Sequence, residues 1–350
     1  MNNPLAYTRS HQEQSGISLV EILVALAIGL FLTAGTIQIL IANKQSYRLQ
    51  ENLSRMQENG RFAMQILTSN IREAGYQGCS SSNVSSNITN TLNNPSSYYS
   101  DFSKGIQGYD YSTSAWSPPL PSAITSPLEG SDIIVIRKSE GTGLTPLPNG
   151  ASGNYSTSPS ADLKAAAGNG LSQCDIAVIS DCAHSSIFQI SSADPNGSGS
   201  IAHNTGSVCS NGPNNGTKDL GTTYKSDAQI MKIATTSYYL RTTASGTPSL
   251  YRKVNSNSAE ELVEGVEDMQ ITYGVDANGN GFANYYTAAN NITDWSSVVS
   301  VHISLLLRTL DDNLTASAQT YQFNGASTTA TDKRLREVAS TTIAIRNHLK

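Results

Sequence analysis

One uncharged apolar run near the N-terminus limits what this chain can fold into. Residues 22–42 read ILVALAIGLFLTAGTIQILIA, and a helix of this length spans the hydrocarbon core of a bilayer. The run is longer than the apolar region of an ordinary secretory signal, and no small-residue cleavage site follows it. We therefore expect residues 22–42 to stay in the mature chain as a transmembrane helix.

Glu21 stands directly before this run, where an unpaired carboxylate is costly in hydrocarbon. The preceding segment, MNNPLAYTRSHQEQSG, is polar and ends at Gly16. Gly16, the sequence ISLVE and the long apolar run together resemble the class III leader of type IV prepilins and type II secretion pseudopilins. The resemblance implies that a membrane peptidase cleaves after Gly16 and methylates the new amine of Ile17. It also implies that Glu21 pairs with the N-terminal amine of a neighbouring subunit and sets the assembly register. The alternative is that Glu21 lies in the headgroup region of a single-pass anchor.

A helical pattern continues beyond the apolar run. Apolar or small residues recur at steps of three or four, with charged side chains between them, and Gly75 is a suitable helix stop. The pattern predicts one helix from about Leu19 to Ala74. Its polar half is too short for a typical coiled-coil seam, so we expect it to pack on a head domain. The stripe consists of Leu49, Leu53, Met56, Gly60, Ala63, Leu67 and Ile71.

Beyond Gly75, short apolar runs alternate with long stretches rich in Ser, Asn, Gly and Pro, which predicts a β-sheet with large loops. The sequence thus predicts an α+β, pilin-like fold with a leader (1–16), a helix (17–75) and an antiparallel β-sheet head (76–350). The most irregular parts are residues 80–130, 141–173 and 192–223. The clearest strands are residues 132–137, 175–180, 186–190, 230–241, 266–275, 297–308 and 337–346.

Several segments of the head are more specific than the anchor. The runs EGVEDMQITYGVD (264–276) and SVVSVHISLLLRT (297–309), the tail from Asp332 to Asn347, and ENGRFAMQILTSNIREAGYQGC in the helix resemble the PilW family of type IV pilus minor pilins. The resemblance implies a subunit at or near the pilus tip that helps to start assembly, with roles in twitching motility and adhesion. A more distant resemblance is to GspJ-like pseudopilins of type II secretion, which gives an alternative function. A membrane-anchored binding protein without a filament role is a third possibility.

The same resemblance implies the partners and the location. The partners would be other minor pilins, the major pilin, the prepilin peptidase and a tip adhesin. The chain would cross the bacterial inner membrane once, with its head in the periplasm, and then move into the extracellular pilus.

The chain has four cysteines, and an even number in an exported protein suggests two disulfides. Four cysteines permit three connectivities, of which we favour Cys174 with Cys182 and Cys79 with Cys209. A zinc site that uses Cys174, Cys182, His184 and Cys209 is the alternative. It is disfavoured because the spacing offers no compact ligand pair and the compartment favours oxidation.

The segment DANGNG (276–281) matches the first half of a calcium-binding loop. It predicts a weak Ca²⁺ site formed by Asp276, Asn278 and Asn280. The second half of the motif fails, because Thr287 stands where a bidentate Glu would be needed. The competing interpretation is a β-hairpin loop rich in Asn-Gly turns.

Charge and motif content exclude other classes of function. The net charge is -5 and no basic cluster is present, so we expect no nucleic-acid partner. The histidines that follow the leader, His184, His203, His302 and His348, are scattered, and neither a P-loop nor a Rossmann glycine pattern occurs. We therefore expect no enzymatic activity, and no cofactor apart from the possible Ca²⁺.

Overall fold

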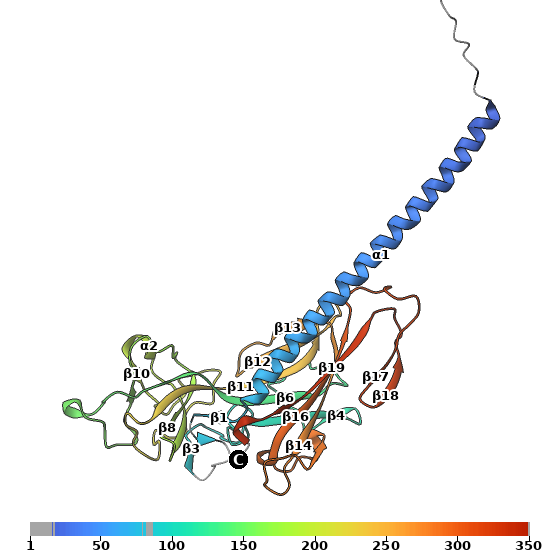
Figure 1. Cartoon of the computed structure of the whole chain (residues 1–350). Helices are drawn as coiled ribbons and strands as arrows, with labels where there is room; N and C mark the ends of the chain where they lie inside the picture. The colour runs from blue at the N-terminus through green and yellow to red at the C-terminus, as the bar shows by residue number, and fades with distance from the viewer. Residues whose placement is uncertain (1–15, 17, 79, 82–86, 349–350) are drawn as a thin grey trace, which may run out of the picture. The chain divides into compact units, whose positions relative to one another are not determined.

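The computed structural model describes residues 16, 18–78, 80–81 and 87–348. The chain forms two compact units, residues 1–52 and residues 53–350. A long apolar N-terminal helix and a large, mainly antiparallel β-sheet domain make up the described chain (Figure 1), which confirms the predicted α+β, pilin-like fold. The cleavage point of the leader remains a prediction.

Helix α1 (Leu19–Arg72) is the longest element. It begins after Ser18, whose carbonyl accepts the N–H groups of Glu21 at 3.0 Å and Ile22 at 3.3 Å. No proline occurs between Pro4 and Pro95, so nothing in the sequence interrupts the helical hydrogen bonds. The helix ends just before Gly75, whose positive φ of 75° turns the chain out of the helix.

The larger sheet has nine strands in the second unit. All pairs are antiparallel except β3 with β9, which is parallel. The main path runs β3-β9-β8-β11-β6-β4-β5, and β12 and β13 extend from β11. The strands are β3 (Ile88–Asn90), β4 (Ile106–Ser112), β5 (Ala115–Ser117), β6 (Ile133–Leu144), β8 (Ile176–Ser180), β9 (Ser185–Gln189), β11 (Gln229–Thr242), β12 (Pro248–Val254) and β13 (Glu260–Glu264).

The second sheet has four antiparallel strands in the order β15-β14-β16-β19. They are β14 (Val266–Val275), β15 (Tyr285–Thr287), β16 (Val298–Arg308) and β19 (Arg336–Ala344). The described residues also contain three short two-stranded pairs: β1 (Tyr76–Gln77) with β2 (Ser80–Ser81), β7 (Leu163–Lys164) with β10 (Ser200–Ile201), and β17 (Thr320–Phe323) with β18 (Ala326–Thr329). Short helices occur at α2 (Pro195–Ser198), η2 (Ala151–Gly153), η3 (Ala289–Asn291), η4 (Trp295–Ser297) and η5 (Arg346–His348).

All seven strands predicted from the sequence are present, as β6, β8, β9, β11, β14, β16 and β19. The segment 80–130 is less irregular than expected, because it contains β3, β4 and β5. β4 reads IQGYDYS, and its polar and tyrosine side chains gave no apolar run to detect.

The part of α1 in the second unit packs on both sheets. Met56, Ala63, Leu67 and Ile71 are buried in one apolar cluster with Ile134 and Ile136 of β6 and with residues of β14, β16 and β19; these include Met269, Ile303, Leu305, Leu307 and Ile343. A Cβ atom at Gly60 would overlap Leu307 Cδ1, so glycine is what permits this close approach. The predicted stripe is thus confirmed from Met56 to Ile71, whereas Leu53 is exposed.

Asp132 joins the two sheets. Its carboxylate accepts the backbone N–H groups of Tyr111 at 3.1 Å and Ile271 at 2.8 Å, and its own N–H donates to the carbonyl of Met269 at 2.8 Å. Burial raises the pKa of this carboxyl to about 7, since desolvation disfavours the charged form. The Ser131 hydroxyl adds a bond to Asp268 Oδ1 at 2.8 Å.

Candidate functional site

The predicted assembly site lies at the start of α1. Gly16 is exposed, Ile17 lies outside the described residues, and Glu21 is exposed in the first helical turn. A carboxylate in this turn interacts favourably with the positive end of the helix dipole. The structure thus places Glu21 on a helix next to the predicted mature N-terminus.

The helical surface that follows Glu21 is apolar. Among the described residues, α1 is the one helix long and apolar enough to cross a membrane, by length and composition. Its large side chains from Leu19 to Ile41 are exposed in the isolated chain. Ala25, Gly29 and Thr33 follow Glu21 at steps of four, so the carboxylate and three small residues share one face. Such a face allows another helix to approach closely.

The segments that carry the family resemblance come together in the second unit. The three head segments contain β14, β16 and β19, which are neighbours in the four-stranded sheet (Figure 1). The fourth segment is the end of α1 that packs on this sheet. Residues that are about 280 positions apart in the sequence, such as Ala63 and Ile343, therefore build one compact structure.

An ion-pair network holds the start of β14 and β19 together. The Arg336 guanidinium donates to both carboxylate oxygens of Glu267, at 2.7 and 2.9 Å, and to both of Asp332, at 2.7 and 3.2 Å. The Arg336 side chain is only 4 % exposed. Its hydrogen bonds lower the pKa of the Asp332 carboxyl. Arg308 also approaches Glu267, with its Nη1 atom 3.7 Å from Oε1.

Sequence reasoning gave no role to this network, although Glu267 and Arg336 belong to the quoted segments. The available signal was the opposite charge of Glu267 and Arg336 near the starts of two strands. This signal can be interpreted only when the order of the strands in the sheet is known. Because β16 lies between β14 and β19, the long arginine side chain is what spans the gap.

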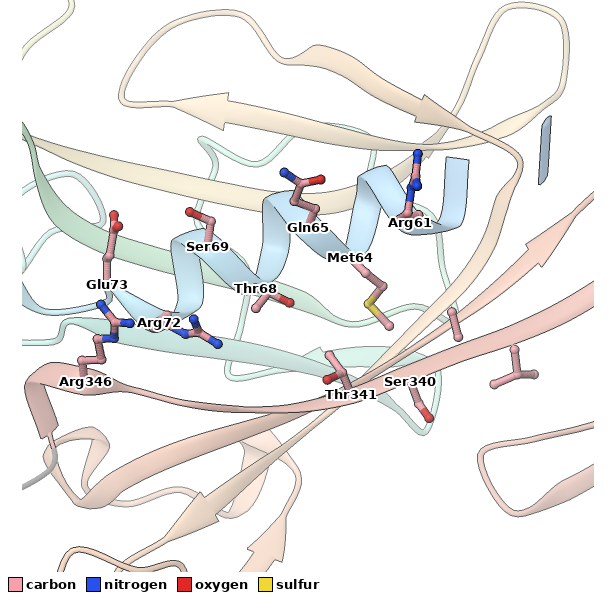
Figure 2. Close-up of a pocket in the computed structure, with 12 residues that line it drawn as sticks. Arg61, Met64, Gln65, Thr68, Ser69, Arg72, Glu73, Ser340, Thr341 and Arg346 are labelled. Carbon is pink, nitrogen blue, oxygen red and sulfur yellow. The ribbon is translucent and has the colours of Figure 1, made fainter. Parts of the chain in front are cut away.

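A groove between α1 and β19 was also not predicted. Residues from 61 to 72 of α1, with Glu73 just beyond the helix, form one wall, and residues 338–341 of β19 with Arg346 form the other (Figure 2). The groove has a volume of about 860 Å³. A neighbouring hollow of about 520 Å³ shares Arg72, Glu73 and Arg346 with it and extends to Tyr76 and Lys138. The groove joins elements from opposite ends of the chain, so no local motif could reveal it.

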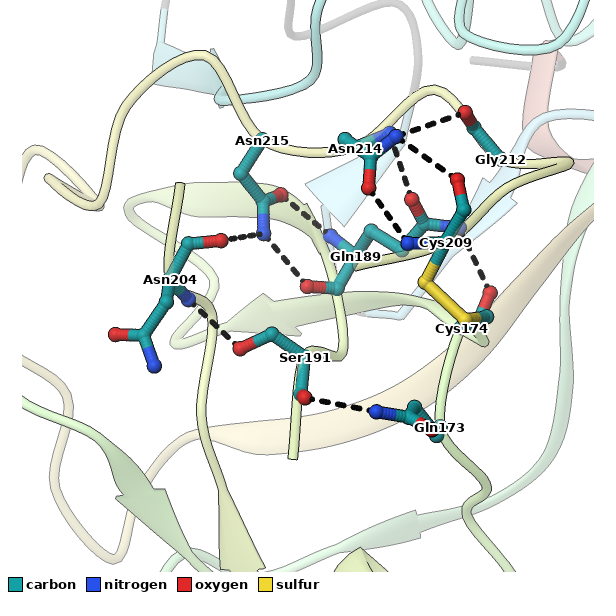
Figure 3. The surroundings of a disulfide bond; sticks show 9 residues. All are labelled: Gln173, Cys174, Gln189, Ser191, Asn204, Cys209, Gly212, Asn214 and Asn215. Atoms are coloured by element: carbon teal, nitrogen blue, oxygen red, sulfur yellow. Dashed lines mark hydrogen bonds between the residues drawn. A yellow bond between two sulfur atoms is a disulfide. The ribbon is translucent and has the colours of Figure 1, made fainter. Parts of the chain in front are cut away.

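The disulfide predictions were wrong. Cys174 is bonded to Cys209, with a Cα–Cα distance of 5.6 Å (Figure 3), which excludes both predicted pairs. Cys174 and Cys182 lie at opposite ends of β8, whose five residues span about 13 Å in four steps of about 3.3 Å, more than a disulfide can bridge. Cys182 is also disulfide-bonded, and Cys79 lies outside the described residues.

Amide side chains fasten the loop that carries Cys209 to β9. Asn214 exchanges hydrogen bonds with the backbone of Cys209, at 2.9 and 3.0 Å, and its own N–H donates to Gln189 Oε1 at 2.7 Å. Gln189 Nε2 donates in turn to the carbonyl of Cys174 at 2.9 Å. The disulfide and these bonds tie Cys209 and Asn214, within the polar segment 192–223, to Cys174 and Gln189 (Figure 3). The zinc alternative is also wrong, because Cys174, Cys182 and Cys209 are oxidised.

The calcium-like loop connects β14 to β15. Asp276 Oδ2 accepts the N–H of Gly281 at 2.7 Å, and Oδ1 accepts those of Gly279, Asn280 and Asn278 at 2.7, 3.1 and 3.3 Å. These bonds, led by that from Gly281, lower the pKa of the Asp276 carboxyl. The loop therefore folds as a hairpin that its own carboxylate caps. Calcium binding stays a prediction, and an ion would have to compete with these hydrogen bonds. The described residues contain no group of three or more His, Cys, Asp or Glu side chains placed to hold a metal.

One comparison with known protein families gave a match, to part of the β-sheet domain. An apolar N-terminal helix joined to an antiparallel β-sheet domain defines a pilin-like α+β protein. Residues 237–347 match the model of the PilW family, described as type IV pilus-assembly protein W. The match runs from the middle of β11 to η5 and includes β14, β16, β19 and the Arg336 network. It indicates a role in type IV pilus assembly. Comparisons with curated proteins and with solved structures gave no match.

Proposed function

We propose that this chain is a minor pilin of a type IV pilus, which enters the filament at or near its tip and helps to start assembly. In this proposal, it first crosses the inner membrane once with its head in the periplasm. A prepilin peptidase removes residues 1–16 and methylates Ile17, and the subunit then joins other minor pilins and the major pilin in the extracellular pilus. Twitching motility and adhesion, the latter through a tip adhesin, are the activities that it would serve.

The position of Glu21 carries the proposal. An unpaired carboxylate left in hydrocarbon costs a few kcal/mol on insertion scales, and a cation from a neighbouring helix removes this cost. Cleavage after Gly16 would create such a cation, the amine of Ile17, on every processed subunit. One subunit's Glu21 can then pair with the amine of the next, so that the pairing fixes the stagger between adjacent helices.

The residues that follow Glu21 support the same association. In lipid, no hydrophobic force drives helices together, so close packing through small residues contributes most. Ala25, Gly29 and Thr33 lie on the face of α1 that also carries Glu21. A partner helix can therefore approach the backbone on the face where the charge pair forms. The match of residues 237–347 to a pilus-assembly family supports a pilus rather than a secretion system as the destination.

The test replaces Glu21 by Gln in the cell and measures this protein in sheared pili and in membranes by immunoblotting. We expect the variant to accumulate in membranes at the wild-type level but to fall roughly tenfold or more in pili, the loss that a pairing free energy of about 1.4 kcal/mol produces. Glu51→Gln is the matched control, because Glu51 is an exposed glutamate on the same helix beyond the apolar run. Equal amounts of the Glu21 variant and wild type in pili would contradict the proposal.

Two further measurements separate the parts of the proposal. Mass spectrometry of the mature N-terminus is expected to find a methylated Ile17, and any other first residue would refute the predicted processing. Deletion of the gene is expected to abolish twitching and to leave type II protein secretion intact. The reverse result would assign the chain to a secretion pseudopilus, and its presence only in membranes would make it an anchored binding protein.

A further inference from the structure

The groove between α1 and β19 lies along an unpaired strand edge. β19 is the last strand of its sheet, and among the described residues no strand pairs with its second edge. The groove follows this edge, with Val338 among its lining residues. Ser340 of β19 lies on one side and Thr68 and Arg72 of α1 lie on the other (Figure 2). All of these residues belong to the second unit.

The register shows which backbone groups face away from β16. The N–H of Ile345 donates to the carbonyl of Val299 at 2.9 Å, in register with the β16–β19 ladder. In an antiparallel pair, bonded and non-bonded positions alternate, so the N–H and C=O groups of Val338, Ser340 and Thr342 point outward. Within the described residues, no hydrogen bond to these outward groups is present.

The first outward position shows how such groups are satisfied. At Arg336, the side chain of Gln319 accepts the backbone N–H at 2.7 Å and donates to the carbonyl at 2.9 Å. This is the pair of bonds that an added strand would make. The Gln319 side chain satisfies only the backbone of Arg336. The outward backbone groups at the following positions of β19 are left without a partner among the described residues.

The strand itself lacks several of the features that normally prevent unwanted pairing. Exposed edge strands are commonly protected by proline, by lysine, by β-bulges or by being very short. β19 has nine residues, contains neither proline nor lysine, and pairs with β16 without a register shift. Its residues from Val338 to Ala344 are uncharged. An edge of this kind is suited to pairing with another chain.

The groove has a positive charge that no described residue neutralises. Arg61, Arg72 and Arg346 line it, all three are exposed, and none forms an ion pair with another described residue. Glu73 is the one carboxylate in the lining, and it is bonded to Lys138 Nζ at 2.6 Å. Three free guanidinium groups beside an open edge favour a partner that brings carboxylates.

We propose that this groove binds an extended acidic segment of a partner protein, which adds to β19 as a further strand. The segment exchanges backbone hydrogen bonds with Val338, Ser340 and Thr342, and its carboxylates face Arg61, Arg72 and Arg346. Backbone bonds then provide affinity, and the arginines select for acidic sequences. The inference goes beyond the proposed function: it concerns the head alone and holds whether or not the chain enters a pilus.

The test uses the full chain in detergent micelles and a fluorescein-labelled peptide of roughly eight residues that alternates Thr and Glu, a common strand length. Binding is measured by fluorescence anisotropy. We expect the acidic peptide to bind and the same peptide with Lys in place of Glu not to bind. Arg72→Glu combined with Arg346→Glu should weaken binding roughly tenfold or more, which corresponds to about 1.4 kcal/mol.

Two controls separate strand addition from a general attraction for anions. Lys225→Glu combined with Lys333→Glu makes the same change in charge at exposed positions outside the groove lining, and it should leave the affinity within about twofold of wild type. An acidic peptide that is N-methylated at alternate residues keeps its charge but cannot donate to the edge, and it should bind roughly tenfold more weakly.

Three results would overturn the inference. The first is absence of binding at millimolar concentration, and the second is equal loss in both charge variants. The third is equal affinity for the methylated peptide, which would show that only charge is recognised. Self-association of the full chain that the acidic peptide does not displace would assign the edge to a second copy instead.

Discussion

Replacement of Arg336 by Met is expected to destabilise the head strongly. The change removes four hydrogen bonds to Glu267 and Asp332, and hydrogen bonds to charged groups contribute about 1.5–3 kcal/mol each. A simple sum of about 6–12 kcal/mol is too large, because one guanidinium makes all four bonds. The two carboxylates are also 23 % and 22 % exposed, so water can replace part of the loss. We expect a decrease of about 3 kcal/mol in the free energy of unfolding, at the lower end for a broken buried pair.

Urea unfolding followed by tryptophan fluorescence measures this decrease in the full chain in micelles. Both tryptophans of the chain, Trp116 and Trp295, lie in the head, and Trp295 is buried against Tyr273. Arg336→Lys keeps the charge but cannot form the forked contacts with the two carboxylates. Its free energy of unfolding should therefore decrease by about half as much as that of Arg336→Met. Lys333→Met is the control, because Lys333 is exposed in the adjoining loop and forms no ion pair with a described residue.

The pH dependence provides an independent check on the same reasoning. Hydrogen bonds from Arg336 lower the pKa of Asp332 below its ordinary 3.8. The contribution of the ionised Asp332 to the stability of the folded state is therefore complete above pH 3.8, and it is lost as the pH falls through the lowered pKa. The difference between wild type and Arg336→Met should therefore narrow in acid. The account would be refuted if Arg336→Met were as stable as Lys333→Met. It would also be refuted if the difference in unfolding free energy between wild type and Arg336→Met did not change with pH.

Three further predictions concern the core, the sheet junction and the disulfide. Leu67→Ala should lower the free energy of unfolding by about 3 kcal/mol, because Leu67 is fully buried, whereas the half-exposed Phe62→Ala should cost much less by the same urea assay. Since the pKa of Asp132 is raised to about 7, the folded state keeps a proton that the unfolded state loses near pH 4, and stability should fall by up to about 1.4 kcal/mol per pH unit between these values. Urea titrations from pH 4 to 8 should show this fall in wild type but not in Asp132→Asn, and parallel curves would contradict it. Replacing both Cys174 and Cys209 by Ser opens a loop with a sequence separation of 35 and should cost about 4 kcal/mol, and an unchanged urea midpoint would show that the amide network alone holds the loop.

The sequence predicts the long helix and the central strands because their patterns are local. Residues 22–42 form one uncharged run. Strands such as β6 and β16 contain consecutive or alternating apolar residues, a pattern that their burial in the core accounts for. β12 and β13 were not predicted, because no local apolar pattern marks them. They contain charged side chains and lie at the end of the larger sheet, where hydrogen bonds to β11 and between the two strands determine the structure.

The head features that could not be predicted depend on residues distant in the sequence. The pairing of Cys174 with Cys209 follows from a loop that amide side chains hold against β9, and no spacing rule encodes such a contact. The Arg336 contact with Glu267 needs the order β14-β16-β19 to be known. The Glu21 assembly site stays a prediction, and it could be proposed from the sequence because a lone charge beside an apolar run is visible without knowledge of the fold.

The packing of α1 on the final strands also affects how the chain is made. Met56, Leu67 and Ile71 are synthesised early, but the cluster that buries them includes Ile343 and Ile345, which follow them in the sequence by more than 270 positions. A chain that lacks β19 would therefore expose part of this apolar stripe, and exposed apolar surface is what chaperones and proteases act on. Concealment of the helix thus depends on a strand that is synthesised long after it.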